Sequence, residues 1–305
     1  MTTSPNKRQL ILGWIAVSLS ILITCFWAFW GIIENFHEGW YFRSFWQNVA
    51  LMFAQYLSIM LASLIVALLA IRWPVVGVTV HFGVGVFALW FFSGAHYTVH
   101  LTFSGALFLI GILYFFGRPR PKKLAYGLAI GLPLLTVIGF GIEPAWRVAH
   151  RYDDGNLDAR LVEGNGVKLI WAPAGPGWPD EGVSWHEAKK RCKYLTEDGK
   201  SLADTPQNIW RLPTVEESVS SMCRHGKNCG GVWDAKNKRA VYKITPDKES
   251  PLWNVYSPVI YRWTGTLVDE KSAYHIVYHG RVSPRPKDLR VRYFSFRAVK
   301  DVKEE

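Results

Sequence analysis

The sequence predicts a multi-span α-helical membrane region followed by a soluble α+β domain. The first observation is the charge distribution: residues 1–143 carry eight Lys/Arg and three Asp/Glu, whereas residues 144–305 carry 27 and 21. The second is that the charge-poor half consists of long apolar runs, and the third is that the other half alternates short strand and helix patterns. An abrupt change in charge density of this kind marks a domain boundary.

Uncharged runs long enough to cross a bilayer, which needs roughly 20 apolar residues, fill the first half. Residues 9–33, 48–71 and 124–142 each predict one span. Residues 73–117 are uncharged but too long for one helix, and small and polar residues gather near 93–102, which predicts a fold-back and two spans. We therefore expect a five-span membrane domain over residues 1–145, with a single span at 73–117 as the alternative.

The loops between the predicted spans differ sharply in basic residues. One side carries Lys7, Arg8, Arg72, Arg118, Arg120, Lys122 and Lys123, and the other carries Arg43. Because short cytoplasmic loops are enriched in Lys and Arg, the N-terminus is expected in the cytoplasm of a cell with a bacterial-type inner membrane. Five spans then place the second half outside the cytoplasm, whereas four spans would leave it inside.

The predicted spans contain little that could do chemistry. His81 is their one ionisable residue, whereas pumps and ion transporters carry several. Haem held by two histidines would need them at matching depth, and His96 and His100 lie near the outer turn, so we expect no cofactor. Gly127 and Gly131 have the GxxxG spacing that permits close helix packing.

The first outer loop contains a polar cluster, Glu34, His37 and Glu38. The first two have the Glu-x-x-His spacing of carboxylate metal sites, but such sites need carboxylates from further helices, and the membrane half offers only Glu143 besides. We interpret the loop as an aromatic belt at headgroup depth, around Trp40, with polar residues that hydrogen-bond locally. No metal is expected.

Residues 146–160 are predicted to be a linker, and residues 161–300 a separate domain. The segment "GVKLIWAPAGPGW" predicts a strand that ends in a Pro/Gly turn. Ser184 with Glu187 then forms a capping box at a helix start. The residues that recur at helical spacing, and so predict the buried face, are Trp185, Ala188, Cys192 and Leu195.

The segment "WRLPTVEE" predicts a second helix start. Thr214 is placed at the N-cap and Glu217 three residues later, and Pro213 holds the chain extended before them. Trp210 and Leu212 alternate along the approach and are expected to be buried against the first helix. Arg211 points the other way, and we interpret it as a tie between loops, with ligand binding as the alternative.

Three strand patterns follow an irregular region that ends near Pro251: "VIYRWTGTL", which contains Trp263, "SAYHIVYHGRV" and "VRYFSFRAV". Tyr274, Ile276 and Tyr278 alternate on one face, and residues 279–280 predict a hairpin turn. A strand, two helices and then a small antiparallel sheet make the domain α+β. Residues 301–305 are a charged tail.

These motifs, in this order, resemble the Lcl C-terminal-type domain of bacterial surface proteins. The pattern is also similar to the larger formylglycine-generating, sulfatase-modifying superfamily, and both are relatives of the C-type-lectin fold. The resemblance covers roughly residues 160–300 and implies a C-type-lectin-like domain, but a fold does not fix a function. The residues expected to hold this scaffold are Trp210, Arg211, Pro213, Thr214, Glu217 and Trp263.

The resemblance argues against catalysis. Formylglycine-generating enzymes hold copper with a pair of cysteines near the C-terminal end, and a thiolate pair suits Cu(I). The matching end here, "YFSFRAVK", has no cysteine, and none follows Cys229. We therefore expect a domain that is not an enzyme and needs no cofactor, with an oxidase that has a displaced metal site as the alternative.

The cysteines fit an outer location. Cys192 lies on the buried helix face, where a free thiol is the default. Cys223 and Cys229 bracket a polar loop and are expected to form a disulfide in an oxidising compartment. With three cysteines in the domain, other pairings stay open.

Basic residues gather near the end of the domain, which has a net charge of +6. They are Arg281, Arg285, Lys287, Arg290, Arg292 and Arg297. Arginine recognises sulfate, phosphate and carboxylate well. One interpretation is a solvated face near anionic lipid headgroups; the other, implied by the adhesin-like resemblance, is a site for an anionic glycan or envelope polymer. Nucleic acid is not an expected partner outside the cell.

The sequence therefore predicts an integral membrane protein that displays a non-catalytic ligand- or partner-binding domain on the outer face. The lipid bilayer is one partner, and an anionic glycan, an envelope polymer or another membrane protein is the other. A subunit of a membrane transport or envelope-assembly complex, with the outer domain as its docking surface, is a further alternative.

Overall fold

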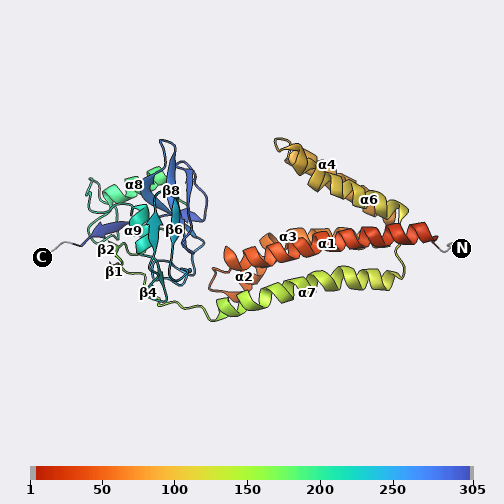
Figure 1. The fold of residues 1–305 in the computed structure, drawn as a ribbon, viewed down its shortest axis with the longest axis horizontal. Coiled ribbons are helices and arrows are strands. Elements are labelled where there is room, and N and C mark those ends of the chain that lie inside the picture. Colours follow the sequence, from red (N-terminus) through yellow and green to blue (C-terminus); the bar gives the residue numbers. More distant parts are fainter. Residues whose placement is uncertain (1–4, 303–305) are drawn as a thin grey trace. The chain divides into compact units, whose positions relative to one another are not determined.

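The computed structural model describes residues 5–302 and divides into two units, each treated by itself (Figure 1). The helical unit comprises Met1–Trp40 and Ser44–Ala149. The β-rich unit comprises Tyr41–Arg43 and His150–Glu305. An apolar helical region followed by a sheet domain is the coarse architecture that the sequence predicts.

The helical unit contains long apolar helices. Its elements are α1 (Lys7–His37), α2 (Phe45–Leu51), the π-helix η1 (Met52–Tyr56), α3 (Ser58–Arg72), α4 (Pro74–Phe91), α5 (Tyr97–His100), the π-helix η2 (Leu101–Gly105), α6 (Ala106–Phe116) and α7 (Lys122–Ala149). Four continuous helical segments within the described residues are long and apolar enough to cross a membrane, namely α1, α4, the run from α5 to α6, and α7. A bent pair, α2–η1 with α3, turns by 60° and would make a fifth span if it crosses as one. The predicted fold-back of residues 73–117 is confirmed, because a turn at residues 92–96 separates α4 from α5.

Local signals explain where these helices start and how closely they pack. Asn6 and Gln9 form a reciprocal capping box at the start of α1, which satisfies otherwise free backbone N–H groups. A Cβ added at Gly77 would lie 2.5 Å from Ala70, so α4 approaches α3 closely there. The GxxxG prediction is wrong for contacts within this chain, because a Cβ at Gly127 or Gly131 would meet nothing within 4 Å.

Two sheets and two short helices build the β-rich unit. The first sheet is antiparallel, in the order β1-β2-β11, with β1 (Arg160–Gly164), β2 (Val167–Trp171) and β11 (Val299–Asp301). The second has the order β10-β7-β8-β9, with β7 (Tyr261–Leu267), β8 (Ser272–Val277), β9 (Val282–Pro286) and β10 (Phe294–Ser295), and only β10 is parallel to its neighbour. The helices are α8 (Trp185–Tyr194) and α9 (Val215–Ser220), and two small hairpins pair β3 (Cys223–Arg224) with β4 (Lys227–Asn228) and β5 (Val232–Asp234) with β6 (Arg239–Val241).

The order strand, helix, helix, irregular region, sheet is as predicted, with corrections at the boundaries. The predicted last strand is split between the two sheets, as β10 and β11. The predicted linker is shorter, because α7 runs to Ala149 and β1 begins at Arg160. In the predicted tail, Asp301 belongs to β11, and residues 303–305 lie outside the described residues.

Two hydrophobic clusters hold the β-rich unit together, one on each side of β8. The first contains the predicted face of α8 together with Trp210, Leu212 and Trp263, which confirms that the "WRL" strand is buried against this helix. The second joins α9 and β2 to Tyr274 and Ile276, with Tyr278 packed against it, so the predicted alternation in β8 is also confirmed. Since β8 is buried on both faces, it is the central strand of the unit.

Candidate functional site

The "WRLPTVEE" segment forms the scaffold that its pattern predicts. The Thr214 hydroxyl accepts a hydrogen bond from the Glu217 backbone N–H at 3.1 Å, and the Glu217 carboxylate accepts from the Thr214 N–H at 2.7 Å. Arg211 donates to both carboxylate oxygens of Glu217 and to Asp301, each at 2.7 Å. Burial alone would raise the pKa of Glu217, but these bonds hold it below its usual value. Arg211 is therefore a tie between loops, with its donors engaged by acids.

The indole N–H groups of the scaffold are also satisfied. Trp210 donates to the carbonyl of Thr196, Trp185 to that of Thr264, and Trp263 to that of Val183, each at 2.8 Å. These bonds pin α8 and the neighbouring loops to β7. At the start of α8, the Ser184 hydroxyl accepts from the Glu187 N–H at 3.3 Å, but the Glu187 carboxylate binds Arg191 at 3.0 Å, so the expected capping box is half formed.

Cys223 and Cys229 lie at the two ends of the β3–β4 hairpin, and the predicted disulfide between them is not formed in this structure. In the hairpin register Cys223 pairs with Asn228, so Cys229 lies one residue beyond the position opposite Cys223. The Cys223 thiol instead lies 3.2 Å from the Ser221 carbonyl. Burial raises the pKa of both thiols, that of Cys229 to about 11.

Two groups of histidine and carboxylates have metal-like spacing. His225, Asp247 and Glu249 offer ligand atoms that all lie within 4.8 Å of one another, and so do Glu34, His37 and Glu38 in the helical unit. In the first group His225 binds Glu249 at 2.5 Å and Arg224 binds Asp247 at 3.0 Å, so the acids already have cationic or hydrogen-bonding neighbours. Such pairing is what a structural loop requires, and we assign neither group as a metal centre.

The predicted basic cluster is divided in the structure. Lys287 and Arg297 are 7% and 0% exposed, so the expectation that they meet an external ligand is wrong. Lys287 places its ammonium 5.0 Å from the ring of Trp185, and Arg297 is bound inside the unit. The exposed members, hereafter the exposed arginines, are Arg281, Arg285, Arg290 and Arg292.

The exposed arginines have no acid to neutralise them. Arg281 directly precedes β9, an edge strand, and Arg285 lies on it, while Arg290 and Arg292 lie on the connection from β9 to β10. No carboxylate of the described residues comes within ion-pair distance of any of the four. Arg290 donates one hydrogen bond, to the carbonyl of Gly182 at 3.2 Å. Their charges are thus available to an anion from solution.

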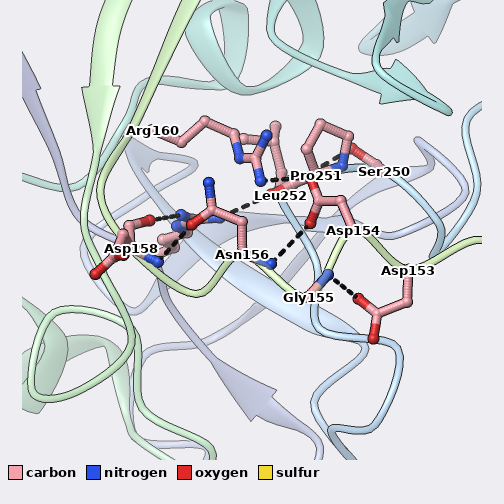
Figure 2. Close-up of polar contacts among 10 residues, drawn as sticks. Asp153, Asp154, Gly155, Asn156, Asp158, Arg160, Ser250, Pro251 and Leu252 are labelled. Carbon is pink, nitrogen blue, oxygen red and sulfur yellow. Dashed lines mark hydrogen bonds and ion pairs between the residues drawn. The ribbon is translucent and has the colours of Figure 1, made fainter.

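The acids of the unit are instead used by the chain itself. Figure 2 shows Asp153 and Asp154 accepting from backbone N–H groups two residues on, at 3.1 Å each, while Arg160 binds Asp154 at 2.6 Å. Elsewhere, hydrogen bonds from their own turns lower the pKa of three exposed carboxylates. These are Asp198, Asp234 and Asp269. Local use of the acids leaves the surplus positive charge on exposed arginine and lysine.

Sequence reasoning missed a second basic surface, an open hollow beside α8. It is lined by Lys189, Lys190 and Lys193 together with Asn208 and Arg211. The three lysines are exposed, and Lys189 lies beside the buried face of α8, with its ammonium 4.9 Å from the centre of the Trp185 ring. The run "KKRCK" carried this signal, because lysines at i, i+1 and i+4 share one side of a helix.

Arginines in the interior were missed as well. Arg262 on β7 is 4% exposed and lies 3.9 Å from the centre of the Trp253 ring, and Arg297 lies 3.6 Å from that of Trp178. Arg297 donates to the carbonyls of Ala172 at 2.7 Å, Pro251 at 3.1 Å and Asp158 at 3.4 Å. In "YRWTGT" and "FRAV" these residues look like outward-facing positions of half-buried strands, so the alternation gave no sign of their burial.

The chain has four to five helices able to cross a membrane, which indicates membrane association. An α+β domain follows them, and its surface carries arginines and lysines without ion-pair partners among the described residues. These two features define the class of protein. A family model, described as a domain of unknown function (DUF7670), matches residues 4–125. The match covers helices α1 to α6 and the first residues of α7, and none of the β-rich unit. Neither the curated proteins nor the solved structures contain a match.

Proposed function

We propose that this is an integral membrane protein whose β-rich unit is a non-catalytic binding domain for an anionic polymer, such as an acidic glycan of the cell envelope. The observation that carries the proposal is the division of charge. Several acids of the unit are bound by its own turns and by arginines such as Arg211 and Arg191. Within residues 5–302, no carboxylate lies within ion-pair distance of the exposed arginines or of the lysines beside α8.

Polymer binding suits this distribution. A single exposed ion pair contributes little, about 0–1 kcal/mol. A polymer with repeated carboxylate, sulfate or phosphate groups meets several cations at once, and linked contacts raise the overall affinity. The C-type-lectin-like scaffold suggested by "WRLPT", with its capping box and Arg211 tie, supports the proposal as a fold used for display of a binding surface.

The location of the domain outside the cytoplasm is part of the proposal, and a reporter that is active only there tests it. Fused after Glu305, it is expected to be active, because five spans return the chain to the outer side. The same reporter fused after Lys123, in the loop richest in basic residues, is expected to be inactive. Activity of the Lys123 fusion alone would contradict the proposed topology, because it is the result expected both for five spans in the opposite orientation and for four spans with a cytoplasmic N-terminus.

Charge reversal tests the binding surface on the full chain in detergent. Arg285→Glu with Arg290→Glu is expected to weaken retention on immobilised heparin, used as a sulfated-polymer probe, by about tenfold, because two attractions become repulsions of about 0.2–1 kcal/mol each. The matched control is Lys236→Glu with Arg239→Glu, two exposed residues on the β5–β6 hairpin that give the same change in net charge.

A third variant, Lys189→Glu with Lys193→Glu, separates the two basic surfaces. If only the Arg285/Arg290 variant loses heparin retention, binding is assigned to the exposed arginines. If only the Lys189/Lys193 variant loses it, binding is assigned to the hollow beside α8. An equal decrease in all three double variants would mean that heparin responds only to net charge, which would contradict a defined binding surface.

A further inference from the structure

A small cavity lies inside the β-rich unit, between α9 and the two sheets. Its volume is about 10 Å³, which is room for about one water-sized sphere. Its polar lining comes from Trp171 on β2, Ser218 on α9, Trp253, Arg262 on β7, and Arg297. Each of these five residues is at most 5% exposed, so nothing in bulk solvent can satisfy them.

Four of these five side chains have a polar atom without a hydrogen-bond partner. They are the indole nitrogens of Trp171 and Trp253, the Arg262 Nε and the Ser218 hydroxyl. Buried donors are almost always satisfied in folded proteins, because an unmet donor loses its bond to water and gains nothing. Three other buried indoles of the domain follow this rule, since Trp185, Trp210 and Trp263 each donate to a carbonyl. Three unmet N–H donors and one unmet hydroxyl thus belong to residues that line the same cavity.

The cavity is also positively charged. Arginine stays protonated in proteins, and Arg262 and Arg297 bring two guanidinium groups to its wall. No carboxylate of the described residues is within ion-pair distance of either, and none lines the cavity. Burial lowers the pKa of both arginines, and Asp180 and Asp154, which act on them from a distance, oppose this only in part. A buried charge is normally paired.

These constraints select the occupant. It must accept hydrogen bonds from up to four donors, carry negative charge and fit a space the size of a water molecule. Sulfate, phosphate and carboxylates are too large. Water would have to place two hydrogens of its own where the lining offers one free acceptor, the Ser218 oxygen. A small monatomic anion carries the charge, only accepts hydrogen bonds, and is closer to water in size than sulfate, phosphate or a carboxylate.

We propose that this cavity is a chloride-binding site, in which Trp171, Trp253 and Arg262 donate hydrogen bonds to the ion and Arg262 and Arg297 neutralise it. The ion joins β2 and β7 to the loop that carries Trp253, so it acts as part of the core. This inference does not depend on the proposed polymer binding, because the exposed arginines lie on other elements.

The test uses the full chain in detergent, in chloride or in gluconate at equal ionic strength. Unfolding of the β-rich unit is followed by pulse labelling of Cys192, which is buried in its core. Chloride is expected to raise the urea midpoint in a saturable way, as any ligand of the folded state does. Trp253→Phe removes the N–H and keeps the ring that covers Arg262, and it is expected to weaken chloride binding about tenfold or more.

Trp185→Phe is the matched control, because it removes an indole N–H that already has a carbonyl acceptor. It is expected to be less stable but to keep the full chloride response. An anomalous signal from bromide between Trp171 and Trp253 in crystals would locate the ion directly. A midpoint that is independent of chloride, or an equal chloride response in both variants, would overturn the proposal, the first in favour of water and the second in favour of a bulk salt effect.

Discussion

Arg297→Met is expected to lower the unfolding free energy of the β-rich unit by about 3–5 kcal/mol, because three backbone carbonyls lose their donor together. Ala172, Pro251 and Asp158 all accept from this one guanidinium, and an unsatisfied buried acceptor costs about 1–3 kcal/mol. The contact with Trp178, at 3.6 Å, is lost as well. The substitution also removes a buried charge, whose desolvation opposes folding. The expected loss of unfolding free energy is therefore smaller than the sum over the separate contacts.

The measurement is the urea midpoint of the full chain, read by pulse labelling of Cys192. Arg297→Lys keeps the charge but cannot reach three carbonyls with one flat fork, so an intermediate loss is expected. Arg239→Met, at an exposed position of β6, is the control and should stay within about 0.5 kcal/mol. A midpoint for Arg297→Met equal to that of the control would mean that the three carbonyls find other donors.

Arg297 also shows where sequence reasoning reaches its limit. In "YFSFRAVK", strand alternation puts Phe294, Phe296 and Ala298 on one face and Arg297 on the other. The structure buries the apolar residues and Arg297 alike. The chain leaves one sheet after Ser295 and joins the other at Val299, and Trp178 covers the guanidinium of Arg297. The passage of the chain from one sheet to the other depends on contacts with residues distant in sequence. Local alternation of apolar and polar residues therefore could not predict the burial of Arg297.

Features set by neighbouring residues were predicted correctly. The capping box of Thr214 and Glu217 and the buried face of α8 each depend on spacings of three or four residues. The spans depend on composition, and the span made of two helices is bent by 60° between Tyr56 and Ser58. The disulfide between Cys223 and Cys229 stays a prediction for an oxidising compartment, and both thiols are free in this structure.

Raising the pH from 7 to 8 is expected to stabilise the folded β-rich unit through Lys248. The segment "DKE" looks solvent-exposed in the sequence, yet Lys248 is 8% exposed and donates to the Ser257 carbonyl at 2.6 Å. Burial, together with the charges of Arg151 and Arg262 and against the opposing effect of Asp180, lowers the pKa of Lys248 to about 7. In the unfolded chain the pKa is about 10.4.

The sign follows from proton counts. Below pH 7 both states hold the proton, and Lys248 adds no pH dependence. Between pH 7 and about 10.4 the unfolded chain keeps a proton that the folded one has lost, so the unfolding free energy rises with pH. The rise through this lysine is about 1 kcal/mol between pH 7 and 8, because a full proton difference is worth about 1.4 kcal/mol per pH unit.

Lys248→Met isolates this contribution from that of the cysteines, which act in the opposite direction. Burial raises the pKa of Cys192 to about 12, so the folded state loses stability as the unfolded thiol ionises near pH 8.5. The wild-type protein and Lys248→Met share this effect of Cys192. We therefore compare their urea midpoints at pH 7 and at pH 8, and the change in the difference between them reports Lys248 alone. A difference that does not change with pH would show that Lys248 is charged in the folded protein at pH 8, and that its carbonyl partner and neighbours solvate the ammonium inside the domain.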